Sequence, residues 1–160
     1  MNQIVNQYSA LWMAGAFVFL VVLIILRHKP TPGDYIALGV VIVGLVVAWI
    51  MLHPRQTPLM DDAQMVQEMI GQGKPVLLEF QSPYCIGCTQ IKPVVDELDN
   101  ELMNQLLIIR LNIQEEVGRE LAPLYGFEFT PTFILFDGNG NELWREVGGL
   151  DTQRVRDSID

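Results

Sequence analysis

Residues 76–88 read VLLEFQSPYCIGC, an apolar run that leads directly into two cysteines separated by two positions. The apolar part, Val76–Phe80, has the pattern of a strand buried inside a sheet. A helical pattern follows from about Cys85 to Met103, and Pro93 within it is expected to kink the helix. Cys85 would then lie at a helix N-terminus, where unpaired N–H groups and the helix dipole favour an anion. This position predicts a lowered pKa and a raised thiolate fraction for Cys85.

A CxxC pair at a strand-to-helix junction is typical of thiol–disulfide exchange. The Cys85 thiolate would attack a substrate disulfide, and Cys88, one turn along, would resolve the mixed disulfide. A static disulfide and half of a metal site are the alternatives. A tetrahedral zinc site needs two further ligands, and the only histidines, His28 and His53, lie at the ends of apolar runs. We therefore expect neither a metal nor another cofactor.

The chain after the second apolar run alternates between helical and strand patterns. This order predicts an α/β fold in which a central mixed sheet is flanked by helices on both faces. The expected elements are a helix from Asp61 or Asp62 to about Gln72, a strand in Pro75–Gln81, the helix Cys85–Met103, a strand Leu106–Ile113, a helix Glu115–Tyr125, strands Thr132–Phe136 and Glu142–Val147 joined as a hairpin, and a short helix opened by Asp151.

Several segments, in the same order along the chain, resemble the thioredoxin family, and the resemblance covers about Asp62–Ile159. These segments are Val76–Phe80 followed by Tyr84–Cys88, Pro93, Arg110–Ile113, Tyr125–Phe127, Phe129–Thr132, and Gly148-Gly149. The resemblance implies a thioredoxin-like fold. The sequence also departs from the family in three ways. Tyr84 replaces a tryptophan, Ile86-Gly87 replaces Gly-Pro between the cysteines, and the family's first strand is hard to find. We therefore expect the sheet to lack one edge strand.

The resemblance also implies roles for single residues. Cys85 would be the nucleophile and Cys88 the resolving thiol. Pro131 would be cis and packed against the disulfide, which would leave the Thr130 backbone available to pair with an extended substrate. An apolar rim for a protein substrate would be formed by Tyr84, Ile86, Gly87, Gly148 and Gly149.

Glu79 takes the place of the family's buried aspartate behind the active site. A buried carboxyl has a raised pKa and could relay the proton of the resolving thiol. The alternative is a partly solvated strand residue. Arg110 matches a basic position near that carboxyl and could pair with it, although a surface position is equally compatible with the sequence.

The N-terminal third holds two long apolar runs, which indicate a hairpin of membrane spans at about residues 9–26 and 35–52. Neither run has a polar face, which argues against an ordinary amphipathic core helix. A cleaved signal peptide is disfavoured because residues 1–10 lack Lys and Arg, and a basic segment rather than a small-residue cleavage site follows the first run. We expect a hairpin over residues 1–53, a linker over 54–61 and a thioredoxin-like domain over 62–160.

The distribution of basic residues predicts the orientation. Arg27 and Lys29 lie in the loop between the two runs, against Arg55 alone after the second run. The positive-inside rule therefore places the loop in the cytoplasm and the globular domain outside it, on the periplasmic or cell-surface side. Residues 56–160 carry 7 basic and 18 acidic side chains. This excess of negative charge disfavours nucleic acid as a partner.

The sequence thus predicts a membrane-tethered oxidoreductase that reduces disulfides outside the cytoplasm. Its partners would be protein substrates that contain cysteines or disulfides, a membrane electron donor that re-reduces the pair, and the lipid bilayer. Ile86 and Gly87 place no basic side chain between the cysteines, which argues against a strong oxidant. A disulfide-forming oxidase, a copper-delivery module that uses both thiolates, and an interaction protein that holds partners without redox chemistry stay open as alternatives.

Overall fold

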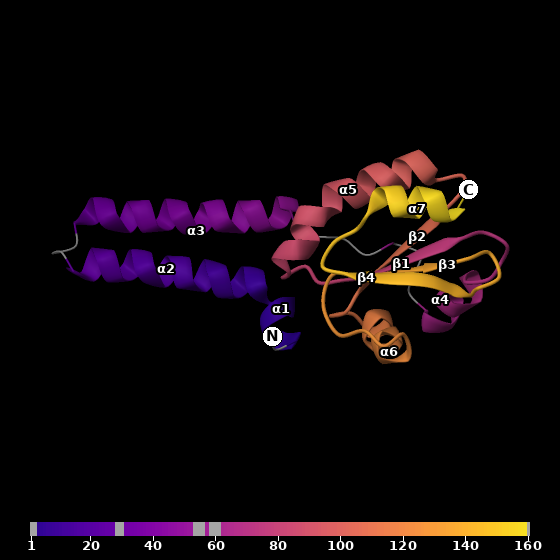
Figure 1. The fold of residues 1–160 in the computed structure, drawn as a ribbon. Coiled ribbons are helices and arrows are strands. Elements are labelled where there is room, and N and C mark those ends of the chain that lie inside the picture. The colour runs from indigo at the N-terminus through magenta and orange to yellow at the C-terminus, as the bar shows by residue number, and fades with distance from the viewer. Residues whose placement is uncertain (1–2, 28–30, 53–56, 58–61, 160) are drawn as a thin grey trace.

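The computed structural model describes residues 3–27, 31–52, 57 and 62–159 of the chain. Figure 1 shows a pair of long helices that lie side by side, next to a sheet that is layered between shorter helices. The elements are α1 (Gln3–Gln7), α2 (Ser9–Arg27), α3 (Pro32–Leu52), α4 (Ala63–Met69), β1 (Val76–Gln81), α5 (Ile86–Leu102), β2 (Leu107–Asn112), α6 (Glu116–Leu124), β3 (Thr132–Phe136), β4 (Glu142–Val147) and α7 (Thr152–Ile159). From α4 onward the order of helices and strands is the predicted one.

The four strands found among the described residues form one mixed sheet in the order β2-β1-β3-β4. Strand β1 pairs in parallel with β2 and antiparallel with β3, while β3 and β4 form the antiparallel hairpin. All six residues of β1 are buried, as its apolar sequence predicts for a central strand. The mixed sheet with helices on both faces confirms the predicted fold class.

Alternate residues of the strands build two cores, one on each face of the sheet. Leu78 and Phe80 of β1 pack with Val66 of α4 and Leu121 of α6. On the opposite face, Leu77 packs in a second core with side chains of α5 and α7. Figure 1 shows α5 and α7 together on one side of the sheet and α4 and α6 on the other. Because Glu79 follows Leu78, its side chain lies on the α5 face.

Helices α2 and α3 lie side by side and extend away from the sheet (Figure 1). Both are long and apolar enough to cross a membrane, by length and composition. Their side chains are exposed or half-exposed from Ser9 to Arg27 and from Pro32 to Met51. The ends that lie next to the sheet domain are the start of α2 and the end of α3.

Three features differ from the sequence-based expectation or lie outside its reach. Helix α4 ends at Met69, before the expected Gln72, because Ile70 is already extended and Gly71 takes a positive φ of 91°. The linker falls mostly outside the described residues; Thr57 alone is described, and its N–H donates to the Arg110 carbonyl at 3.2 Å along the outer edge of β2. Helix α1 was not anticipated by any pattern in the sequence.

Candidate active site

Cys85 is the N-cap residue of α5, with extended backbone angles of φ −94° and ψ 122°. Its Sγ accepts a hydrogen bond from the backbone N–H of Cys88 at 3.3 Å. In an ordinary helix a Ser or Asp oxygen would satisfy this N–H. Here the sulfur occupies that position, so the helix N-terminus stabilises a negative charge on Cys85, as the sequence predicts.

The two thiols of the pair have opposite electrostatic surroundings. A hydrogen bond from the Cys88 thiol, helped by the backbone N–H groups of Cys88 and Gly87 and opposed by burial, lowers the pKa of Cys85 from 9.0 to about 6. Burial raises the pKa of the Cys88 thiol strongly, and its hydrogen bond to Cys85 raises this pKa further. Cys85 is therefore the thiolate of the pair at neutral pH, and Cys88 holds the proton.

The loop before β3 lies against Cys85. The Thr130–Pro131 peptide bond is cis, as the family resemblance implies. The Thr130 carbonyl oxygen lies 3.5 Å from Cys85 Sγ and accepts from its thiol when that is protonated. Gly148, at a φ of 86°, donates its N–H to the Pro131 carbonyl at 2.9 Å. A Cβ added to Gly87 would lie 3.3 Å from the Pro131 ring and 3.7 Å from Cys85 Sγ, so Gly87 lies directly against both Pro131 and the sulfur of Cys85.

Glu79 lies behind the cysteines and is only 2% exposed. Its Oε2 finds no hydrogen-bond partner among the described residues, and the nearest cation is Arg110, with Nε at 3.6 Å. Burial raises the pKa of Glu79 to about 7, against the lowering effect of Arg110 and with a further rise from Asp96. Its charge in turn raises the pKa of Cys88, so the two groups are electrostatically coupled.

Arg110 is shared among three carboxylates. Besides Glu79, it contacts Asp96 through Nη1 and approaches Asp99 with Nη2 at 3.6 Å. Asp96 also accepts from Lys92 at 2.5 Å, one turn earlier on α5. Of the two alternatives that the sequence left open for Arg110, the structure thus supports the pair with Glu79 rather than an unpaired surface position. The sequence did not indicate Asp96, although a lysine and an aspartate four positions apart on one helix are a pattern that could have found it.

Among the expected rim residues Gly148 is exposed, whereas Tyr84 is half-buried under aromatic side chains of the N-terminal third. The ring of Tyr84 stacks between Tyr8, at a centroid distance of 5.5 Å, and Trp49, at 6.4 Å. Tyr8 is also fixed to the domain, because its hydroxyl donates to Gln114 at 2.8 Å. Tyr8 and Trp49 belong to the N-terminal third, and sequence reasoning did not connect either one to the site.

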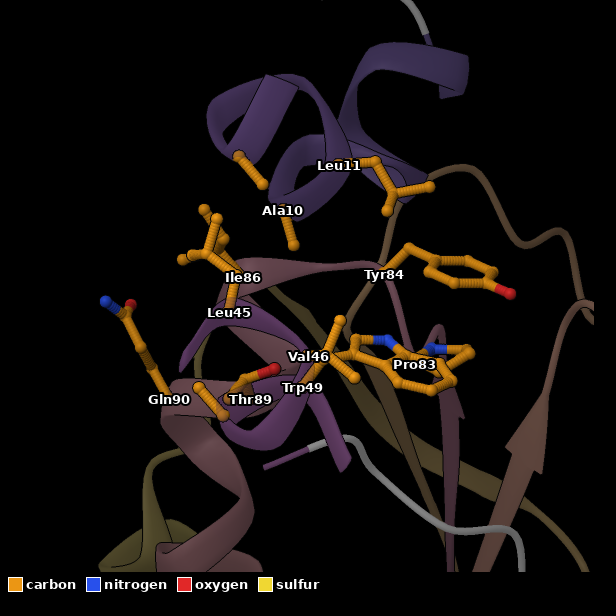
Figure 2. Close-up of a pocket in the computed structure, with 12 residues that line it drawn as sticks. Ala10, Leu11, Leu45, Val46, Trp49, Pro83, Tyr84, Ile86, Thr89 and Gln90 are labelled. Atoms are coloured by element: carbon orange, nitrogen blue, oxygen red, sulfur yellow. The ribbon is translucent and has the colours of Figure 1, made fainter. Parts of the chain in front are cut away.

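A cavity of about 500 Å³ lies between the active-site turn and the near ends of α2 and α3. Figure 2 shows Ala10 and Leu11 of α2 on one side of it and Val46 and Trp49 of α3 on another, with Ile86 among them. The lining is almost entirely apolar. The CxxC turn therefore faces the apolar helices, and the helices are part of its surroundings.

The comparisons with known proteins agree with this geometry. Residues 63–160 match the family described as a thioredoxin-like domain. Thioredoxin of Synechocystis sp. is 32% identical over 104 residues, which cover 65% of this chain and 94% of that protein. The chloroplastic M-type thioredoxin of Pisum sativum is 28% identical over 123 residues, which cover 74% of this chain and 70% of that protein.

Solved structures give the same fold. A single-site mutant of a thioredoxin from Halobacterium salinarum superposes with a TM-score of 0.51 at 25% identity, covering 60% of this chain and 80% of that one. Mitochondrial thioredoxin 3 of Saccharomyces cerevisiae, in its oxidised form, superposes with a TM-score of 0.51 at 16% identity, covering 60% of this chain and 86% of that one. At this identity the likeness shows the fold alone. The fold, the CxxC pair and these likenesses define the class of thiol–disulfide oxidoreductases. The chain belongs to the thioredoxin-like family, with Cys85 and Cys88 as its redox pair.

Proposed function

We propose that this chain is a membrane-tethered oxidoreductase that reduces disulfides of protein substrates outside the cytoplasm. The observation that carries the redox assignment is the position of Cys85 as the N-cap of α5, where Cys88 donates to its sulfur from both N–H and thiol. Such a thiolate is the attacking species in disulfide exchange. The division into a hairpin over residues 1–53, a linker over 54–61 and a catalytic domain over 62–160 is part of this proposal.

The first step is attack of the Cys85 thiolate on one sulfur of the substrate disulfide. A Cys85–substrate disulfide forms, the substrate's own S–S bond breaks, and the other substrate sulfur leaves as a thiolate that takes a proton from solvent. Pro131 and the Gly148 turn, which are joined by a hydrogen bond, would form the wall against which the substrate lies. The backbone of Thr130 would pair with the substrate chain.

The second step requires Cys88 to lose its proton. We assign the acceptor role to Glu79, whose pKa of about 7 matches a base that works near neutral pH. The Cys88 thiolate then attacks Cys85 Sγ, so that a Cys85–Cys88 disulfide forms, the Cys85–substrate bond breaks, and the second substrate sulfur leaves as a thiolate that takes a proton from solvent. Two electrons have moved from the cysteine pair to the substrate, and a membrane electron donor must return them before the next cycle.

The tether rests on the N-terminal helices. Exposed apolar side chains along α2 and α3, such as Trp12 at 62% and Ile36 at 69%, are unfavourable in water and favourable in a bilayer. The basic residues Arg27, at the end of α2, and Lys29, two positions further along the chain, support a cytoplasmic loop, and hence an extracytoplasmic domain. Labelling of single cysteines, introduced at residue 31 and at residue 159 in a Cys85→Ser/Cys88→Ser background, with an impermeant reagent on intact cells tests the orientation. The proposal requires labelling at 159 and protection at 31.

Trapping in membranes tests the enzymatic proposal. In a Cys88→Ser variant the second step is blocked, so substrates should accumulate as mixed disulfides on Cys85. The double variant Cys85→Ser/Cys88→Ser is the matched control. Adducts that disappear with dithiothreitol and are absent from the control support the proposal, whereas no adduct with any protein would contradict it.

Equilibration of the full chain with glutathione buffers then separates a reductant from an oxidase, because an oxidase would hold a labile, strongly oxidising disulfide.

A further inference from the structure

The backbone of Thr130 is already paired in this structure. Asn6 of α1 donates its Nδ2–H to the Thr130 carbonyl at 3.0 Å, and its Oδ1 accepts from the Thr130 N–H at 2.7 Å. The same Oδ1 accepts from the Thr130 hydroxyl at 2.9 Å. The two residues are 124 positions apart in the chain. Both main-chain groups of Thr130 are thus bonded to one side chain.

The carboxamide of Asn6 presents the same groups as a peptide bond. It has a carbonyl acceptor and an N–H donor side by side, and in a β-ladder a neighbouring strand offers the same two groups to one residue. An extended substrate that paired with Thr130 would need these hydrogen bonds for itself. Asn6 and a substrate strand therefore compete for one position.

The neighbours of Asn6 hold α1 in place on the active-site turn. Gln7 accepts a hydrogen bond from the Ser82 hydroxyl through its main-chain carbonyl at 2.9 Å. Ser9 Oγ accepts from the Ile86 N–H at 3.1 Å, and the Ala10 N–H donates to the carbonyl of Tyr84 at 2.8 Å. The segment from residue 6 to residue 10 thus bonds to the turn on both sides of Cys85.

Cys85 itself is only 1% exposed in this arrangement. Disulfide exchange needs the thiolate to reach a sulfur atom of the substrate directly. A protein disulfide cannot approach so buried a sulfur, although its low pKa prepares it for attack. Cys85 is thus ionised for attack, but its sulfur is shielded from a protein disulfide.

We infer that the segment Gln3–Ala10 is an intramolecular competitor of protein substrates, with Asn6 in the place of the substrate backbone. The inference rests on the proposed function and adds a regulation of the same site. Substrates react only with the fraction of molecules in which this segment has left Thr130, and a membrane-proximal partner that binds the segment would activate the enzyme. The rate observed is the intrinsic rate multiplied by that open fraction.

The test compares two amide side chains of the same helix in the full chain, reduced and reconstituted in lipid nanodiscs. Asn6→Ala removes the hydrogen bonds to Thr130. Gln7→Ala is the matched control, since Gln7 contacts Ser82 through its main chain, which the substitution leaves in place. Two rates are measured at one pH: alkylation of Cys85 by iodoacetamide, and single-turnover oxidation of the cysteine pair by excess insulin, whose disulfides serve as the protein substrate.

We expect Asn6→Ala to raise both rates on the order of 10- to 100-fold, the range for the loss of two or three neutral hydrogen bonds, and Gln7→Ala to change neither. A Ser9→Ala variant, which removes the acceptor of the Ile86 N–H, should move both rates in the same direction. The inference is overturned if Asn6→Ala changes neither rate. It is equally overturned if insulin oxidation slows while alkylation is unchanged, because Asn6 would then position substrates rather than exclude them.

The same measurements keep the two proposals apart. Suppose that Asn6→Ala speeds the alkylation of Cys85, but insulin does not oxidise the cysteine pair and no mixed disulfide is trapped. This result would support Gln3–Ala10 as a segment that closes the site, and it would contradict the proposed reductase. Trapped adducts in the chain with Asn6 unchanged, together with no effect of Asn6→Ala on either rate, would support the reductase and contradict the competing segment.

Discussion

Replacing Glu79 with Gln should change how the stability of the protein depends on pH. Burial raises the pKa of Glu79 in the folded chain to about 7 from an ordinary value of 4.5. The folded state therefore prefers the protonated carboxyl. This preference stabilises the folded chain fully below pH 4.5, and the stabilisation is lost as the pH rises through 7.

The size of the effect follows from the shift. A difference of about 2.5 pKa units, at ~1.36 kcal/mol per unit, corresponds to about 3 kcal/mol between the protonated and ionised limits. Glu79 is 2% exposed, so solvent screens little of this energy. Gln keeps the shape and cannot ionise. Between about pH 5 and pH 8 the wild type should lose about 2–3 kcal/mol more than Glu79→Gln.

The assay is pulse proteolysis in urea of the oxidised full chain in detergent, at several pH values. The oxidised form is chosen because its cysteines do not titrate, which leaves the ionisation of Glu79 uncoupled from that of Cys88. Glu68→Gln, at an exposed position on α4, is the control and should behave as the wild type. Equal pH slopes for wild type and Glu79→Gln would refute the reasoning, since Glu79 would then titrate alike in folded and unfolded chains.

Three further outcomes follow from the same contacts. Gly118→Ala should lower the unfolding free energy by about 2 kcal/mol or more in urea, because its Cβ would overlap the backbone at the end of β2, whereas Gly149→Ala, with open space around it, should cost far less. Arg110→Met should raise the pKa of Glu79 above 7, seen in a carboxyl NMR titration, because a nearby positive charge is lost; a fall in that pKa would contradict the ion pair. Glu79→Gln should slow the release of substrate from a preformed mixed disulfide by about 100-fold at neutral pH, measured by stopped flow, while the first attack stays unchanged; equal slowing of both steps would rule out a relay.

Much of the fold could be predicted because its determinants are local. The apolar run of β1 and the glycines after α4 act within a few residues, and the order of helices and strands follows from such signals. The N-cap position of Cys85 is likewise a local consequence of a strand that ends just before a helix. The environment of Glu79 was reachable only through the family resemblance, since a single carboxylate in a strand does not reveal what lies behind it.

The contacts of α1 could not be predicted from the sequence. Asn6 and Thr130 lie 124 positions apart, and neither residue belongs to a periodic pattern. The polar segment before the first apolar run carries no signal that distinguishes a helix from a solvated tail. The stacking of Trp49 on Tyr84 was hidden for a related reason, because an aromatic residue near the end of an apolar run is equally typical of a lipid interface.

The chemistry rests on Cys85 being a thiolate at a pH where Cys88 is still protonated. The direct measurement is the iodoacetamide labelling rate of each cysteine in the reduced full chain, followed by mass spectrometry of the two positions across the pH range. Labelling of Cys85 should rise with a midpoint near pH 6, the value to which its hydrogen bonds lower its pKa, while Cys88 stays unlabelled throughout. A midpoint near 9 for Cys85, its ordinary value, or labelling of Cys88 at the same rate, would contradict the account.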